Sequence, residues 1–168
     1  MTMTTSNKIL GIDPGLRITG YACVKSPGNH RSCLLEAGIL RLDSSKDIPD
    51  RLVDLRKDLE QIIDNLKPNI LAVEQVFSHP KHVRTALVMA HARGVIIECG
   101  RQHDLKIEEL TPTTVKRAIA GTGHASKLQI QESIKNQFEL PKLPTPTDLA
   151  DAIAIAACAA HRSHTISD

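Results

Sequence analysis

The chain begins with a short apolar run, residues 8–12, that ends in a single carboxylate, Asp13. Pro14 and Gly15 follow directly and are typical of a turn, so this stretch predicts a buried strand that stops at Asp13. The carboxylate is then expected to sit rigidly at one end of the strand. Many Asp-Pro-Gly triplets only form turns. A chemical role for Asp13 therefore depends on other acidic residues reaching the same place.

Residues 69–74 repeat the pattern, because they form a second short apolar run that ends in an acid, Glu74. A helix with Leu and Ile at spacings of three and four precedes this run, from about residue 49 to residue 67. A strand that follows such a helix is typically a parallel neighbour of an earlier strand. Parallel neighbours end at the same edge of a sheet, so we expect Glu74 to lie beside Asp13.

Further strands and helices are predicted on both sides of this pair. Ile18–Val24 and Cys33–Leu42 form the strands of a hairpin, with a turn signal at residues 26–29. Residues 106–110 are a further strand candidate, although two of them are glutamates. Two helices follow: Thr111-Pro112 starts one, and Ser126 with Gln129 offers a capping box for the next.

The last helix carries two more acids. Asp148 and Asp151 are three residues apart and so project from one helix face, and residues 152–160 after them carry no charge. Asp148 could simply favour the helix dipole in the first turn. Asp151 sits deeper in an apolar helix that has no basic residue before His161, and a buried carboxylate is costly unless it is paired or binds a metal. A metal ion is the expected partner.

Four carboxylates, those of Asp13, Glu74, Asp148 and Asp151, thus have reason to share one site. Clustered negative charges need cations, and ligands that are all oxygen select Mg²⁺ or Mn²⁺. Two such ions can hold the attacking water and the leaving oxygen of an in-line phosphoryl displacement. The residues predict metal-dependent hydrolysis of a phosphodiester.

Two basic segments without acids support a polyanionic substrate. Residues 75–97 contain Lys81, Arg84 and Arg93, and residues 111–131 contain Lys116, Arg117 and Lys127. An ordinary basic helix face is the simpler interpretation of either segment alone. Beside candidate active-site acids, contact with phosphates is favoured.

The segment after Glu74 has further features. Phe77 is one of only two Phe in a chain without Trp, and it either stacks on a base or anchors its loop. His79 and His82 lack the other ligands of a metal site. Small residues at positions 86, 90 and 94 allow close helix approach, either within the chain or between two copies of it.

The 168 residues fit one domain, with residues 1–7 and 163–168 expected to be flexible ends. The four cysteines show no metal-ligand spacing, no secretory signal is evident, and no apolar run reaches the ~18 residues that span a bilayer. Reduced thiols in a cytoplasmic protein are expected, although Cys23 and Cys33 could face each other across the hairpin. A net charge of +2 only hints at an anionic partner.

Together these motifs resemble the RuvC family of bacterial crossover junction endodeoxyribonucleases. The similarity runs from about Lys8 to Arg162 and is carried by Gly11–Gly15 with Thr19-Gly20, Val73–Phe77, Ala92-Arg93-Gly94, Val115-Lys116 and Asp148–Ala152. It implies an α/β fold of the ribonuclease H-like type, a five-stranded mixed sheet with three antiparallel strands, then parallel ones, flanked by helices.

The resemblance also implies a function. A homodimer would cut Holliday junctions during homologous recombination and DNA repair by nicking two opposite strands symmetrically, with two Mg²⁺ per site (or Mn²⁺ as a substitute) and with RuvA and RuvB as partners. Asp13, Glu74, Asp148 and Asp151 match the family's catalytic acids and metal ligands.

The DNA-binding residues are less evenly matched. Phe77 matches the aromatic that engages the junction centre, and Lys116 and Lys127 match lysines near the DNA. Lys81 and Arg84 are added as contacts because of their charge. Residues 78–85 depart from the family's pattern, which leaves that loop and the sequence preference open.

Two other functions compete with a nuclease. Ile-Asp-x-Gly with a following Thr also opens actin-like ATPases and sugar kinases, but those need a second lobe that 168 residues do not hold. A junction-binding protein without activity is the other alternative. Such a protein would normally have lost one of the four acids, and all four are present.

Overall fold

The computed structural model describes residues 6–27, 31–76 and 83–165, with side chains through residue 163. The five strands are β1 (Asn7–Asp13), β2 (Ile18–Ser26), β3 (Cys33–Arg41), β4 (Ile70–Glu74) and β5 (Lys106–Leu110). The five helices are α1 (Ile48–Leu66), α2 (Val83–Gln102), α3 (Pro112–Ala120), α4 (Lys127–Gln137) and α5 (Thr147–Thr165). β1 begins at Asn7 and α5 ends at Thr165.

All strands join one sheet in the order β3-β2-β1-β4-β5. β1 pairs with β2 and β2 with β3 in antiparallel fashion, whereas β1–β4 and β4–β5 are parallel. The mixed sheet predicted from the sequence is confirmed. Strands β1 and β4 are buried on both faces, which explains why they are short continuous apolar runs without alternation.

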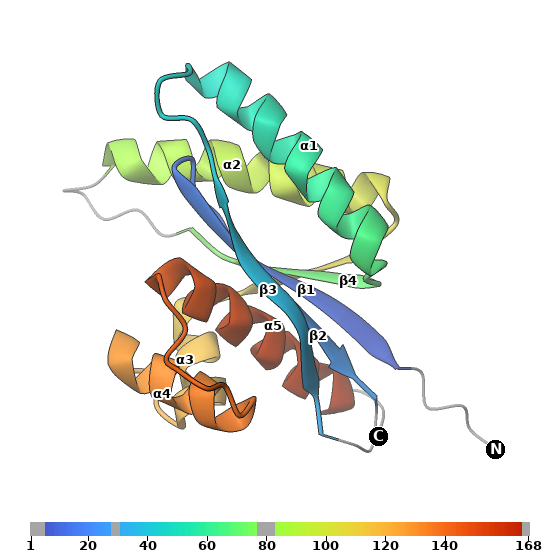
Figure 1. Cartoon of the computed structure of the whole chain (residues 1–168), viewed down its shortest axis with the longest axis vertical. Coiled ribbons are helices and arrows are strands. Elements are labelled where there is room, and N and C mark those ends of the chain that lie inside the picture. Colours follow the sequence, from blue (N-terminus) through green and yellow to red (C-terminus); the bar gives the residue numbers. More distant parts are fainter. Residues whose placement is uncertain (1–5, 28–30, 77–82, 166–168) are drawn as a thin grey trace.

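Helices cover both faces of the sheet (Figure 1). α1 and α2 lie on one face, where Leu10, Ile12 and Val73 point into a core of Leu and Ile from the two helices. α3, α4 and α5 lie on the other face, where Ile9 and Ala72 pack against the alanine-rich middle of α5. The alternation of side chains along β1 thus feeds two separate cores.

Local sequence signals fix where several helices begin and end. Asp47 caps α1 by accepting from the Asp50 amide at 3.0 Å, and α1 ends at Lys67, a left-handed residue before Pro68. Thr111 caps α3, and Ser126 with Gln129 forms the predicted capping box of α4. Within the described residues, no helix has both the length and the apolar character needed to cross a bilayer.

The two hairpin cysteines do not face each other. Cys23 lies opposite Glu36, and Cys33 lies opposite Lys25, on either side of a register shift between Cys23 and Val24. Cys23 is buried and Cys33 is exposed, and all four cysteines are free thiols. The simpler of the two sequence interpretations therefore holds.

Candidate active site

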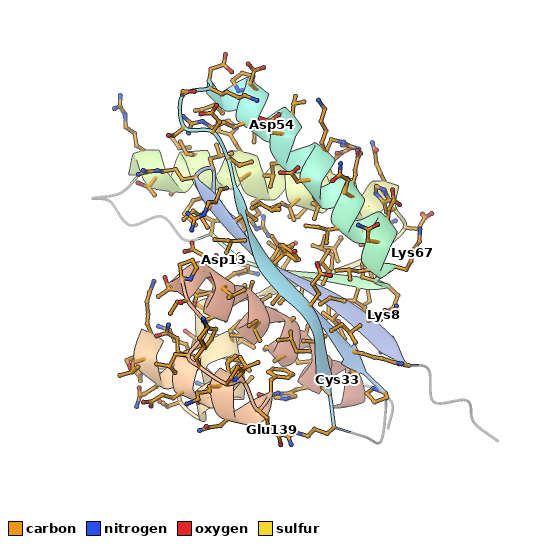
Figure 2. All side chains as sticks on the ribbon, viewed as in Figure 1. Lys8, Asp13, Cys33, Asp54, Lys67 and Glu139 are labelled. Carbon is orange, nitrogen blue, oxygen red and sulfur yellow. The ribbon has the colours of Figure 1, made fainter. Side chains whose placement is uncertain are left out.

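Asp13 and Glu74 end neighbouring parallel strands, as the sequence predicts. The β1–β4 register pairs Ile12 with Val73, so the next residue of each strand is one of these acids. Figure 2 shows Asp13 at one end of β1 and Lys8 at the other, with Asp13 beside α5. Both acids are partly buried. The two rigid strands hold their carboxylates at one edge of the sheet.

Asp148 and Asp151 reach this edge because α5 lies unusually close to the sheet. Gly20 is the register partner of Asp13, and a Cβ atom on it would lie 2.0 Å from the Asp148 carbonyl oxygen. A Cβ on Gly11 would lie 2.5 Å from the Ala156 nitrogen. Real Cβ atoms do not approach backbone so closely, so only glycine fits at these points. The two glycines let α5 bring its first turns next to Asp13.

Thr19 holds the turn that follows Asp13. Its side chain is buried and donates to the Gly15 carbonyl at 2.6 Å, and the Gly15 amide donates back to the Thr19 hydroxyl at 3.2 Å. The turn is thereby tied to the start of β2. The chain leaves β1 in a fixed direction, which keeps the Asp13 carboxylate at the end of the strand.

Burial and the charges of neighbouring acids raise the pKa values of three of these residues, Asp13, Glu74 and Asp151. Burial, followed by the charges of Asp151, Glu74 and Asp148, raises the pKa of Asp13 to about 8. Burial and then Asp151 raise the pKa of Glu74 to about 7. The pKa of Asp151 is also raised, by burial and by Asp148. Crowded carboxylates that resist ionisation are a feature of sites that bind cations or transfer protons.

Two lysines face these acids across a cavity of about 380 Å³, which Glu74, Asp151, Lys116 and Lys127 line together. Lys116 comes from α3, and Lys127 is the first residue of α4, placed there by the Ser126 cap. Both lysines lower the pKa values of Glu74 and Asp151.

This arrangement corrects one step of the sequence argument. Asp151 lacks a basic partner along its own helix, but α3 and α4 supply two positive charges from elsewhere in the chain. Lys116 and Lys127 therefore lie next to the acids, whereas the sequence predicts only that they belong to a basic segment beside the site.

The donor set suits a hard metal ion, since it consists of carboxylate oxygens whose mutual repulsion a cation would relieve. Among the residues that the structure describes, however, no group of three or more His, Cys, Asp or Glu side chains is arranged so that it could hold a metal ion. The four carboxylates lie in one region, but no three of them are arranged to coordinate one ion together. Binding of an ion would have to draw them together.

The structure describes only some of the other predicted site residues. Phe77 and Lys81 lie outside the described residues, as do His79 and His82. Arg84 is exposed on the first turn of α2.

Arg93 is not a free basic residue. Its Nε donates to the Glu74 carbonyl at 3.2 Å and its Nη2 pairs with Glu109. From the sequence, Arg93 is a positive charge in a basic segment and part of the Ala92-Arg93-Gly94 motif, and neither feature predicts these partners. Glu109 lies in the β5 run, where glutamates are unexpected in a strand, and pairing with Arg93 accounts for its presence there.

The small-residue stripe on α2 does not pack inside the chain at its centre. Ala90 and Gly94 are exposed, and a Cβ atom on Gly94 would meet no atom of the described residues within 4 Å. The nearby Val83 and Leu87 are exposed by 47% and 58%. Close helix packing within the chain, the simpler interpretation of the stripe, is therefore wrong at Gly94.

A ribonuclease H-like sheet with clustered acids at the ends of β1 and β4 defines a nuclease-type site. Comparison with known proteins gives the family. The sequence model described as "Crossover junction endodeoxyribonuclease RuvC" matches residues 9–159. The chain belongs to the RuvC family of crossover junction endodeoxyribonucleases. Nucleases of this family are metal-dependent.

Individual relatives agree with this placement. A RuvC of Rhodopirellula baltica is 43% identical over 150 residues, which are 89% of this chain and 84% of that protein. A RuvC of Alkaliphilus oremlandii is 42% identical over 91% of this chain and 92% of its own. The structure of Thermus thermophilus RuvC in complex with a Holliday junction substrate superposes with a TM-score of 0.88 at 25% identity, covering 96% of this chain and 97% of that one.

A more distant structure shares the fold alone. The yeast mitochondrial Holliday junction resolvase Ydc2 has a TM-score of 0.67 at 15% identity and covers 95% of this chain and 82% of its own.

Proposed function

We propose that this protein resolves Holliday junctions by nicking two opposite strands of a four-way DNA junction at symmetric positions. The observation that carries the proposal is the gathering of four acids and two lysines around one edge of the sheet in a member of the RuvC family. The closeness in fold to an enzyme solved with a Holliday junction supports the same substrate. The reaction is hydrolysis of a phosphodiester bond.

Asp13, Glu74, Asp148 and Asp151 are the proposed catalytic residues and the ligands of two Mg²⁺ ions, with Mn²⁺ as a substitute. When bound, such ions activate water and stabilise the leaving oxygen. The protein's part is to hold the oxygens: Asp13 and Glu74 from the sheet, and Asp148 and Asp151 from the first turns of α5. A ligand must be ionised to bind, so a raised pKa makes ion binding release protons.

Lys116 and Lys127 are proposed to contact the phosphate that is cut, because they line the same cavity as Glu74 and Asp151. Arg84 and Lys81 would contact neighbouring phosphates, and Phe77 would stack at the junction centre. Phosphate contacts of this kind position the DNA without reading its sequence.

The decisive experiment is cleavage of a synthetic four-way junction with Mg²⁺ by wild type, Asp13→Asn and the control Asp64→Asn. The control removes an equal charge from an exposed position near the end of α1. We expect paired symmetric nicks from wild type and the control, and a loss on the order of a hundredfold or more in Asp13→Asn, which still binds the junction. Equal cutting of linear duplex, or full activity of Asp13→Asn, would contradict the proposal.

A homodimer is the proposed working form, because opposite strands need two active sites. The exposed face of α2, formed by Val83, Leu87, Ala90 and Gly94, is the proposed contact with the second copy. Work in the cytoplasm together with RuvA and RuvB belongs to the same proposal and follows from the family.

The dimer contact can be tested by introducing a negative charge on α2 and comparing it with the same charge introduced on α1. Ala90→Glu should shift the protein toward monomer in sedimentation equilibrium, because it buries a charge in an apolar contact. Val53→Glu adds the same charge to the exposed face of α1 and should leave the equilibrium unchanged. A dimer that persists in Ala90→Glu would place the contact elsewhere.

A further inference from the structure

Arg93 is a residue of α2 that reaches the acidic edge of the sheet. Its Nε donates to the Glu74 carbonyl oxygen at 3.2 Å, and its Nη2 pairs with the Glu109 carboxylate on the neighbouring strand β5. The side chain is only 20% exposed. One guanidinium therefore joins the helix to two strands at the peptide of an active-site acid.

The place of this contact matters because β4 ends at Glu74. Just beyond it, the Gln75 amide donates to the Leu110 carbonyl at 2.8 Å, which continues the pairing with β5 by one step. Arg93 holds the same peptide from the helix side. A planar guanidinium fixed by a carboxylate at one end presents its other donors in a defined direction.

The environment of Arg93 differs from that of Arg84, one of the proposed DNA contacts on the same helix. Arg84 is exposed, whereas both engaged edges of the Arg93 guanidinium are turned to protein groups. Arg93 is also more than one half of a surface ion pair, because one of its hydrogen bonds goes to a backbone carbonyl beside the proposed reaction site. Holding Glu74 in place is the function that both contacts share.

We infer that Arg93 is a positioning residue for the metal-dependent reaction, which fixes the peptide of Glu74 and so the place of its carboxylate. This inference rests on the proposed function of the site. Glu109 is part of the same device, since it orients the guanidinium. Neither residue needs to touch the ion or the DNA.

The test compares Arg93→Gln, Arg93→Lys and Glu109→Gln with wild type and with the control Arg101→Gln. Arg101 lies on the same helix and also donates to a backbone carbonyl, that of Leu105 at 3.1 Å, but at the other end of the sheet. Four quantities are measured: Mn²⁺ affinity by calorimetry, exchange of the Gln75 amide, kcat on saturating junction, and junction affinity in EDTA.

For Arg93→Gln we expect about tenfold weaker Mn²⁺ binding and about tenfold lower kcat, as for other groups that orient metal ligands. The Gln75 amide should exchange faster and junction affinity should stay the same. Glu109→Gln should give a smaller loss of the same kind. Arg93→Lys should lose less Mn²⁺ affinity and kcat than Arg93→Gln, since an ammonium can keep one of the two contacts of the guanidinium but not both. Arg101→Gln should match wild type.

Two outcomes would overturn the inference. Weaker junction binding with unchanged Mn²⁺ affinity would make Arg93 a DNA contact. A lower melting temperature with unchanged Mn²⁺ affinity and unchanged Gln75 exchange would make it a packing residue. Failure of wild type to cut the junction would instead refute the proposed function, while Mn²⁺ affinity and amide exchange would still report on Arg93.

Discussion

The two faces of the sheet are covered in different ways. On the α5 face, helix backbone rests almost directly on strand backbone, because Gly11 and Gly20 meet the alanines and carbonyls of α5. On the opposite face, Leu and Ile side chains such as Leu59 and Ile96 fill the space between the sheet and α1 and α2. α5 contacts β1 and β2 along much of its length, whereas α1 packs mainly on α2.

The difference follows from what each face carries. α5 carries Asp148 and Asp151, which are proposed to share one site with the acids of β1 and β4, and such a site requires the helix backbone to come close to the sheet. The helices of the other face carry none of the four proposed acids, and larger side chains can separate them from the sheet. Close backbone packing fixes the site but leaves little room for change.

The strongest test of this contrast is the same substitution on both faces. In Gly20→Ala the new methyl would lie 2.0 Å from the Asp148 carbonyl, so α5 must move away. We expect a loss of about 3 kcal/mol in the free energy of unfolding, measured by urea denaturation, and loss of junction cleavage. The backbone cannot yield as a side chain can.

Gly100→Ala is the matched substitution on the other face. Its methyl would lie 2.9 Å from Ile107 Cδ1 and 3.0 Å from Leu71 Cδ1, which are ends of flexible side chains. Alanine also gains about 1 kcal/mol of helix propensity over glycine. We expect a net change below about 1 kcal/mol and normal cleavage. Equal losses in the two variants would show that the two faces are packed with equal tolerance.

The sequence predicts the site better than the contacts that hold it together. Apolar runs that end in Asp13 and Glu74 predict adjacent carboxylates because parallel strands end at one edge, and the spacing of Asp148 and Asp151 predicts a shared helix face. Those rules are local or follow from topology. The register and the strand order agree with them.

The sequence does not predict contacts between segments that are far apart in the chain. Nothing near Asp151 in the chain shows that Lys127 of another helix faces it, and nothing near Arg93 shows that it binds the Glu74 carbonyl. Both depend on how three helices pack on the sheet, which periodicity does not specify. The need for glycine at position 20 has the same origin, since it arises only when α5 lies across β2.

A smaller effect on stability is expected from the negative charge of Asp13, which lies close to other acids. Asp13 has its pKa raised to about 8, while it ionises near 3.8 in the unfolded chain. Between these values the folded state binds more protons than the unfolded state, so without metal the stability falls as the pH rises through this window. At about 1.36 kcal/mol per pKa unit the full difference would be worth about 5 kcal/mol, and solvent screening of this partly exposed carboxylate reduces it. Asp13→Asn removes the charge and should therefore be more stable than wild type by about 2 kcal/mol at pH 8.5, with little difference at pH 4.

Urea denaturation in EDTA at both pH values measures this gap. Saturating Mn²⁺ should shrink or reverse it, because the ion stabilises only a protein that can bind it. If wild type and Asp13→Asn showed the same pH dependence, the pKa of Asp13 would not be raised in the folded protein.

The smallest expected effect lies on the outer side of α2, where no strand constrains the helix. Gly94 is exposed within that helix, and a Cβ atom there meets no atom of the described residues within 4 Å, so Gly94→Ala should stabilise the dilute protein by about 0.5 kcal/mol through helix propensity alone. If a second copy packs on this face, the added methyl lies in the contact and the gain should shrink as protein concentration rises. Thermal unfolding across a hundredfold range of concentration, with wild type alongside, separates the two terms. A gain that is independent of concentration would mean that position 94 faces solvent in the assembled protein, so that the outer side of α2 at this position is free of both the sheet and a partner.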